Sequence, residues 1–408
     1  MRRILYVWEL GTGYGHLVSA LPLAMKLKAR GHEVVFALRD LTHAERFLGR
    51  RGFAILQAPI WLSERRGPEL PVTYAEILAN FGFLDRAGLT GMVKAWRELY
   101  ALVRPHLLLV DHAPTALLAA RGTGIRRVLL GTGFYSPPRT SPMAGLRPWL
   151  NLSPERLLES ERPVVATLNE LLGDLGSEPL DTLAQLFEVD EDFLCTFAEL
   201  DHFPRTGAQY WGPLFASEEG VAPEWPAGTG ERIFAYLSPA YRDFEKVVGQ
   251  LRDLPCRTLI HARGLADKQI MKYQARNVVF SREPVRMAQM SRETDLVISH
   301  GGHGTTAAAL LAGRPVLMLH LQVEQLLLAQ KVVDRGLGKM VNPDSKNPSY
   351  KQLARDVLSD PRFAERAREF ATRYADFDSA KQIDLIVTRC EEIIGRGAGE
   401  PRDMTRAE

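Results

Sequence analysis

The chain has 408 residues, of which 46% are hydrophobic and 25% are charged, and its formal net charge is +2. This length suits two domains, and the composition is that of a globular protein. Because Lys and Arg are interspersed with Asp and Glu, no basic stripe predicts nucleic acid as a partner. The three cysteines lie far apart without metal-ligand spacing, which predicts reduced structural thiols and a cytoplasmic location.

The N-terminal stretch RILYVWEL is apolar and is followed by a helical pattern without a small-residue cleavage site. We interpret it as a first buried strand rather than an export signal. The chain contains no run of about eighteen apolar residues, so the sequence predicts no transmembrane segment. The sequence leaves peripheral contact with a bilayer surface as an alternative.

The first half alternates between strand-like and helix-like patterns. A helical pattern runs from 16 to 30, and the strands EVVFAL, HLLLVD and RRVLLG follow, with a short helix at 114–120 between the last two. This alternation predicts a parallel sheet with right-handed crossovers. The strand HLLLVD ends at Asp111, at the edge where open sheets bind their ligands.

The segment 59–100 has an irregular, helical pattern that is rich in aromatic residues. We interpret most of these aromatics as the core of a helical insertion and the rest as candidates for an acceptor pocket. They are Trp61, Tyr74, Phe81, Phe83, Trp96 and Tyr100. Farther along, residues 213–230 are rich in Pro, Gly and acidic residues without a period, which predicts a linker between domains.

A second alternation begins with RIFAYLS, a helix near 241–251 and the strands TLIHAR and NVVFS. After a glycine-rich turn it continues with VLML, a helix at about 324–335 and the short strand KMV. The final helical region, 360–394, is long enough to cross back onto the first half. Residues after Gly395 are charged and predict a frayed tail.

The most informative segment is 295–319, which contains DLVIS, then HGGHGTT, then a helix and another strand. The turn is suited to an anion, because glycines let backbone amides approach a ligand closely and a helix N-terminus favours negative charge. We expect Thr305 or Thr306 to cap this helix. The sequence therefore predicts a phosphate site here.

Three motifs resemble one family of enzymes. In that family a box opens with Trp-x-Pro and continues, at fixed spacings, with a histidine and an Asp-Gln pair. In this chain Arg282-Glu283-Pro284, His300 and Glu324-Gln325 stand at the matching spacings. The chain thus resembles the nucleotide-sugar-dependent glycosyltransferases of the GT-B fold, in particular the group of UDP-glycosyltransferases and macrolide glycosyltransferases.

The resemblance extends over nearly the whole chain. Gly313-Arg314-Pro315 resembles the family's Gly-Val-Pro, and Gly15-His16 followed by Pro22 resembles its N-terminal Gly-His-x-x-Pro region. The family's stacking Trp is Arg282 here, its ribose-binding Glu is Ala308, and its Gly-Ser is Leu237-Ser238. Loss of the ribose contact would cost a thymidine sugar less than a uridine sugar.

The resemblance implies an α/β protein of two Rossmann-like domains whose parallel sheets face each other across a cleft. It implies an acceptor-binding domain at 1–212, the linker at 213–230 and a nucleotide-sugar-binding domain at 231–375. A C-terminal helix at 376–395 would cross back to the first domain, followed by a flexible tail at 396–408.

The resemblance also implies an inverting, metal-independent transfer of a hexose to a hydroxyl of a small, hydrophobic or lipid-like acceptor. His16 would be the general base and Asp111 the carboxylate that orients it. The co-substrate would be a UDP- or dTDP-linked sugar, with no further cofactor and no metal. The donor would contact residues of both halves: Gly13, Gly15, Ser238, Arg282, His300, Gly301, Gly302, Gly304, Thr305, Thr306, Glu324 and Gln325.

Alternatives remain for several of these residues. His16 can be a structural helix-start histidine, Asp111 can cap a helix, and His300 can be a buried histidine bonded to a carbonyl. Two other functions also fit the motifs. One is a sugar-nucleotide epimerase or hydrolase, and the other is a non-catalytic nucleotide-sugar-binding protein, which the missing Trp and Glu would favour.

Overall fold

The structure is a computed structural model that describes residues 1–13, 15–215 and 220–395. Residues 216–219 of the predicted linker and the predicted tail at 396–408 lie outside the described residues. The chain forms two compact α/β units. The first contains Met1–Phe197, Phe203–Leu214 and the chain from Ser379 onward, and the second contains Ala198–His202 and Phe215–Asp378.

The first unit is built on a six-stranded parallel sheet with the order β3-β2-β1-β4-β5-β6. Its strands are β1 Arg3–Trp8, β2 Glu33–Leu38, β3 Ala54–Gln57, β4 Leu107–Asp111, β5 Arg126–Gly131 and β6 Glu191–Leu194. Its helices are α1 Gly15–Ala29, α2 Ala44–Phe47, α3 Tyr74–Ala79, α4 Arg86–Val103, α5 Pro114–Ala120, α6 Pro154–Asp174 and α14 Ser379–Gly395, with 3₁₀ turns at Gly49–Arg51, Pro148–Leu150 and Leu183–Phe187.

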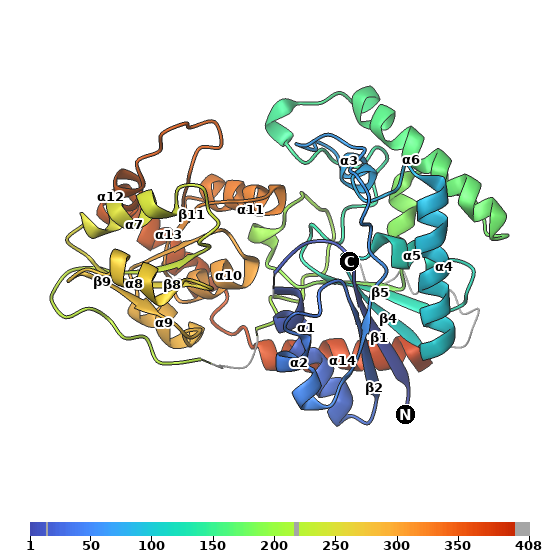
Figure 1. The fold of residues 1–408 in the computed structure, drawn as a ribbon, viewed down its shortest axis with the longest axis horizontal. Coiled ribbons are helices and arrows are strands. Elements are labelled where there is room, and N and C mark those ends of the chain that lie inside the picture. Colours follow the sequence, from blue (N-terminus) through green and yellow to red (C-terminus); the bar gives the residue numbers. More distant parts are fainter. Residues whose placement is uncertain (14, 216–219, 396–408) are drawn as a thin grey trace. The chain divides into compact units, whose positions relative to one another are not determined.

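Strand periodicity divides the core of the first unit into two layers. Ile4, Tyr6 and Trp8 of β1 pack with α1 and α14, whereas Leu5 and Val7 pack with α4 and α5. The two layers lie on opposite sides of the sheet, and α14 runs beside α1 (Figure 1). Because successive side chains of a strand point to opposite faces, this alternation also decides which polar residues can meet near α1.

The second unit repeats the architecture with the order β12-β11-β10-β7-β8-β9. Its strands are β7 Arg232–Leu237, β8 Arg257–Ala262, β9 Val278–Ser281, β10 Leu296–Ser299, β11 Val316–Met318 and β12 Gly338–Met340. Its helices are α7 Phe244–Arg252, α8 Asp267–Tyr273, α9 Met287–Glu293, α10 His303–Leu311, α11 Val323–Asp334, α12 Tyr350–Ser359 and α13 Pro361–Arg373, with a 3₁₀ turn at Ala198–Leu200.

Both sheets therefore have the same strand order, with the first strand of each unit at the centre. The order reverses direction between β1 and β4 in the first unit and between β7 and β10 in the second. Open α/β sheets bind ligands at this switch point, outside the carboxyl ends of the two strands. The predicted α/β architecture of two Rossmann-like units with parallel sheets is confirmed, and it marks one candidate site in each unit.

Three local predictions differ from the structure. The edge strands β3 and β6 were not predicted, because both are short and lack a continuous apolar run. The long helix α6 was not predicted either; its N-cap Ser153 accepts a hydrogen bond from Arg156 N–H, and Pro154 occupies the first helical position. The final helical region is two helices, α13 and α14, interrupted at residues 374–378.

The aromatic insertion is mainly core, as predicted for most of its side chains. Tyr74, Phe83, Trp96 and Tyr100 are buried against α4, α5 and α6. Trp61 and Phe81 are only partly buried. None of the helices in the described ranges combines the length and the apolar character that a membrane crossing requires.

Candidate active site

His16 and Asp111 meet at the switch point of the first unit. Nδ1 of His16 lies 2.8 Å from Oδ2 of Asp111, and both side chains are buried. A carboxylate at this distance accepts the Nδ1 proton, so the Nε2 nitrogen carries the lone pair. The pair thus has the geometry of a base and the group that fixes its tautomer.

Strand register brings the two residues together. Trp8 pairs with Asp111 across the parallel β1–β4 ladder, and His16 stands in the first turn of α1, which follows β1. Trp8 stacks on the His16 imidazole with ring centroids 4.7 Å apart, and the Tyr6 hydroxyl donates to Oδ2 of Asp111 at 2.5 Å. Sequence analysis missed these two aromatic contacts, since they depend on which strand faces coincide.

Gly11 leaves open the space in front of His16. Its φ is +88°, a conformation that favours glycine, and a Cβ at this position would stand 2.7 Å from Nε2 of His16. Gly13 and Gly15 lie nearby in the chain, are exposed, and have no atom within 4 Å of the position that a Cβ would occupy. The turn after β1 is therefore open on the side of the lone pair.

A second buried carboxylate lies next to this turn. Glu9 is 1% exposed and accepts hydrogen bonds from the Thr115 and Ala116 N–H groups at the start of α5. Burial raises the pKa of Glu9 to about 7, although its hydrogen bonds and the Arg39 charge act in the opposite direction. Glu9 therefore anchors α5 to β1 and titrates near neutral pH.

This raised pKa predicts a pH-dependent stability. Between its ordinary pKa and about 7 the folded state keeps a proton that the unfolded state has released, so the free energy of unfolding falls as pH rises. Relative to Glu9→Gln, which cannot ionise, we expect the wild type to lose up to roughly 3 kcal/mol between pH 5 and pH 8. Urea unfolding of both proteins at the two pH values measures this difference. If the free energies of unfolding of the two proteins differ by the same amount at pH 5 and at pH 8, the prediction is contradicted.

A pocket of about 430 Å³ opens at the same edge of the first sheet. It is lined by Trp8, by Arg39 after β2 and by Gln57 of β3, among other residues. Trp8 thus has one contact with the base and one with the pocket. The pocket therefore shares Trp8 with the surroundings of His16.

The glycine-rich turn lies at the switch point of the second unit, between β10 and α10. Gly301 has a φ of +83°, and a Cβ there would stand 2.7 Å from the Cε atom of Met318. Gly302 and Gly304 have ordinary φ values, are exposed and have no atom within 4 Å of a Cβ position. Of these three glycines, only Gly301 has a backbone conformation that favours glycine. The other two glycines keep space clear in front of the first turn of α10.

The helix cap differs from the prediction. Helix α10 begins at His303, and its N-cap residue is Gly302, which has no side chain. Thr305 and Thr306 lie inside the first turn, and the Thr306 hydroxyl donates back to Gly302 O at 3.1 Å. The predicted threonine cap is therefore wrong, and the N–H groups of this turn have no side-chain cap from those residues.

His300 already has a partner at each ring nitrogen. Its Nε2 accepts a hydrogen bond from Ser238 N–H at 2.7 Å, and its Nδ1 donates to Leu319 O at 2.7 Å. Burial lowers the pKa of His300, which agrees with a neutral ring. In this structure His300 links β7, β10 and β11, so the alternative of a histidine bonded to a carbonyl is realised. Donation to a phosphate requires either that Nε2 releases the Ser238 N–H and gains a proton, or that Nδ1 releases Leu319 O.

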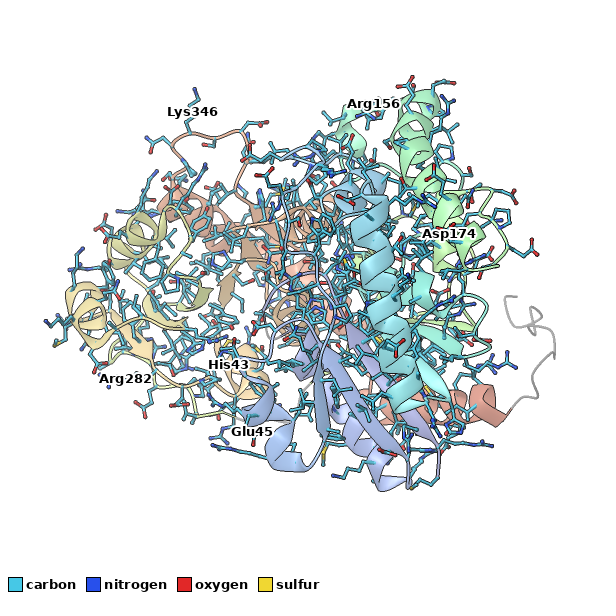
Figure 2. The ribbon with its side chains drawn as sticks, turned by 45° about the vertical axis from the view of Figure 1, so that its right-hand side comes forward. His43, Glu45, Arg156, Asp174, Arg282 and Lys346 are labelled. Atoms are coloured by element: carbon cyan, nitrogen blue, oxygen red, sulfur yellow. The ribbon has the colours of Figure 1, made fainter. Side chains whose placement is uncertain are left out.

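Arg282 lies apart from these residues. It follows β9, an edge strand three positions from β10 in the sheet, and pairs with Asp267 at 2.9 Å. Its side chain is 67% exposed and lies at the periphery of the second unit (Figure 2). The structure does not bring Arg282 together with His300.

Glu324 and Gln325 occupy the first turn of α11. Oε1 of Glu324 lies 3.4 Å from Nε2 of His202, and Glu324 is buried. Gln325 Oε1 accepts from Leu321 N–H at 2.8 Å. The contact with His202 was not predicted, because the segment Ala198–His202 joins the second unit from a distant part of the sequence.

Gly301 connects the turn with α11. A Cβ at Gly301 would stand 3.4 Å from the Gln325 Cβ atom. Ser238, His300, Gly301 and Gln325 therefore gather at the carboxyl edge of the second sheet. Arg282 is the predicted donor residue of this unit that the structure leaves outside the group.

Comparison with known proteins gives consistent results. Residues 258–393 match the family of the erythromycin biosynthesis protein CIII-like C-terminal domain. A PGL/p-HBAD biosynthesis glycosyltransferase of Mycobacterium tuberculosis is 25% identical over 396 residues, covering 91% of this chain and 89% of the relative. The zeaxanthin glucosyltransferase of Pseudescherichia vulneris is 29% identical over 402 residues, covering 93% and 96%.

Solved structures share the fold. The glycotransferase of kitacinnamycin aligns with a TM-score of 0.69 at 21% identity, covering 96% of this chain and 99% of that one. The glycosyltransferase VinC, solved in complex with dTDP, aligns with a TM-score of 0.64 at 17% identity, covering 97% and 100%. The fold is thus the GT-B fold. The matched domain and the relatives of nearly full length support a glycosyltransferase, and the chain is similar to the macrolide and UDP-glycosyltransferase-like group.

Proposed function

We propose that the protein transfers a hexose from a UDP- or dTDP-linked donor to a hydroxyl of a small, hydrophobic acceptor, with inversion and without a metal. The observation that carries this proposal is the buried His16–Asp111 pair, whose open nitrogen faces the space that Gly11 leaves free. In this mechanism His16 removes the acceptor proton through Nε2, and Asp111 stabilises the imidazolium. The acceptor oxygen then attacks the anomeric carbon opposite the leaving nucleoside diphosphate.

The donor side of the proposal rests on the turn between β10 and α10. The open space at Gly302 and Gly304 and the first turn of α10 suit a diphosphate, because the N–H groups and the helix dipole favour negative charge. The same groups would stabilise the charge that develops on the leaving group. VinC in complex with dTDP and the relatives that carry glycosyltransferase names support a nucleotide-linked donor and a glycosyl transfer. The free, buried cysteines support a cytoplasmic location.

A direct test supplies UDP- and dTDP-sugars together with an acceptor library. We expect release of the nucleoside diphosphate that depends on acceptor, survives chelation of divalent metals, and gives a product of inverted anomeric configuration by NMR. Turnover without acceptor that hydrolyses or isomerises the donor would favour the hydrolase or epimerase alternative. Retention of configuration would contradict the proposed mechanism.

The non-catalytic alternative has two observations in its favour. Arg282, which replaces the family's stacking Trp, pairs with Asp267, and His300 is occupied at both nitrogens. Calorimetry distinguishes the alternatives: donor binding without turnover with any acceptor would indicate a nucleotide-sugar-binding protein.

The donor turn gives a prediction with a matched control. At Gly302 a methyl group meets no protein atom within 4 Å, so Gly302→Ala should leave the melting temperature unchanged but place a methyl in the proposed phosphate space. We expect about tenfold weaker nucleotide diphosphate binding by calorimetry, equivalent to about 1.4 kcal/mol. Gly249→Ala in α7, also without neighbours within 4 Å, should leave binding unchanged. Equal affinities of the two variants for the nucleotide diphosphate would contradict the assignment of this turn as the phosphate site.

A further inference from the structure

His112 follows Asp111 directly, and the mechanism above does not use it. Its φ is +46°, a left-handed conformation that residues with a Cβ rarely adopt. The Leu10 N–H group donates to its carbonyl oxygen at 2.9 Å, which ties the residue to the chain after β1. The backbone therefore holds His112 in a strained conformation at the switch point of the first unit, and such strain is common at functional sites.

The His112 side chain is buried, and its nitrogens are unpaired. The residue is 6% exposed, and its ring stacks on Tyr135 at 4.7 Å and meets Phe134 edge-on at 5.8 Å. Neither ring nitrogen has a hydrogen-bond partner among the residues that the structure describes. Burial lowers the pKa of His112 well below its usual value, so the ring is neutral and offers one donor and one acceptor.

Other buried polar atoms at the same edge share this property. Oδ1 of Asp111, the Tyr74 hydroxyl and the Thr132 hydroxyl are buried without a hydrogen-bond partner in the described ranges. Asp111 is the last residue of β4, and Thr132 directly follows the neighbouring strand β5. The Tyr74 ring lies 6.3 Å from the His112 ring. Buried polar groups are nearly always paired in proteins, so this concentration of unpaired atoms indicates a site for a polar ligand rather than a core.

His112 and His16 flank the same space. A Cβ at Gly11 would stand 2.7 Å from Nε2 of His16 and 3.7 Å from Nδ1 of His112. The two nitrogens are therefore separated by no more than the sum of these distances. This upper limit lies within the span that two oxygens on adjacent carbons can bridge, when each oxygen is at hydrogen-bond distance from one imidazole.

We infer that His112 hydrogen-bonds an oxygen of the acceptor adjacent to the hydroxyl that His16 deprotonates. The inference rests on the proposed function and deepens it: the preferred acceptor class is a catechol or vicinal diol rather than an isolated alcohol or phenol. His112 is then a specificity residue that binds the acceptor. A site built to pair with a substrate oxygen discriminates strongly against an analogue that lacks it, because the buried group is left unpaired.

The test compares acceptor pairs that differ by one oxygen: a catechol with the matching phenol, and a vicinal diol with the matching mono-alcohol. We expect the wild type to prefer the two-oxygen acceptor by at least about tenfold in kcat/KM, and His112→Phe to lose this preference. His112→Asn should keep part of it, since Asn retains a donor and tolerates the left-handed conformation. His106→Phe, at an exposed histidine, is the matched control.

Thermal unfolding separates a binding role from a structural one. Because the His112 nitrogens are unpaired in the free protein, His112→Phe should not lower the melting temperature. An equal loss of kcat/KM for both members of each pair, or a lower melting temperature with an unchanged preference, would overturn the inference. If the wild type transfers a sugar to no acceptor, the proposed function fails, and thermal shift then tests whether His112 binds a two-oxygen ligand. A catechol that raises the melting temperature of the wild type but not of His112→Phe supports the binding role. Equal shifts of both proteins overturn it.

Discussion

His16→Ala is expected to lower kcat for glycosyl transfer by about a thousandfold while leaving nucleotide diphosphate binding unchanged. The reason is that the variant removes the nitrogen that accepts the acceptor proton, and general-base catalysis contributes roughly 10²- to 10⁴-fold. Steady-state release of nucleoside diphosphate measures the rate, and calorimetry measures the binding. The effect should be confined to the chemical step, since His16 belongs to the first unit and the donor turn belongs to the second.

His43→Ala is the matched control for that experiment. His43 stands at the start of α2, in the same unit (Figure 2). Its removal should leave kcat within a factor of about two, in the range expected for a surface substitution. A His16→Ala variant that retains a third or more of the wild-type rate would reject His16 as the base.

Asp111→Asn is expected to lower kcat by roughly 10²- to 10⁴-fold with little change in the fold. Asp111 accepts the Nδ1 proton of His16 at 2.8 Å and so leaves Nε2 as the acceptor nitrogen. An amide can donate its N–H to Nδ1 instead, which moves the imidazole proton to Nε2 and gives the wrong tautomer. The loss should appear in kcat at saturating acceptor concentration.

The double variant tests whether the two residues act as a unit. If Asp111 works only through His16, then His16→Ala and the double variant with Asp111→Asn should have equal rates, because the effects of coupled residues do not add. Asp174→Asn is the matched control, since this exposed carboxylate on α6 (Figure 2) pairs with Arg86 in a surface ion pair. Fully additive losses would mean that Asp111 acts independently of the base.

The buried central strands were predictable from the sequence. β1, β4, β7 and β10 are apolar on both faces because helices cover both sides of each sheet, so each appears as a continuous apolar run. The edge strands β3 and β6 are short and partly exposed, and neither was recognised from its sequence. The edge strands β9 and β12 of the second sheet were predicted nevertheless, so an edge position alone does not decide whether a strand can be recognised in the sequence.

The candidate residues were predictable as a set but not in their contacts. A resemblance of motif spacing identified His16, Asp111 and His300, whereas the partners of these residues come from other parts of the chain. Ser238 and Leu319 occupy both nitrogens of His300 only because β7, β10 and β11 are neighbours in the sheet. The pairing of Arg282 with Asp267 likewise depends on how α8 and β9 are placed.

The sequence by itself determined the class of fold, because the alternation of apolar runs and helical patterns is a local property that each segment carries alone. It also located the glycine-rich turn that lies between β10 and α10. Only the tertiary structure decided which polar side chains pair. It set Tyr6, Trp8 and Asp111 on one face through the β1–β4 register, and it buried the His112 ring nitrogens without a hydrogen-bond partner among the described residues. These contacts join residues about a hundred positions apart, and sequence periodicity carries no information on strand order or register across such a separation.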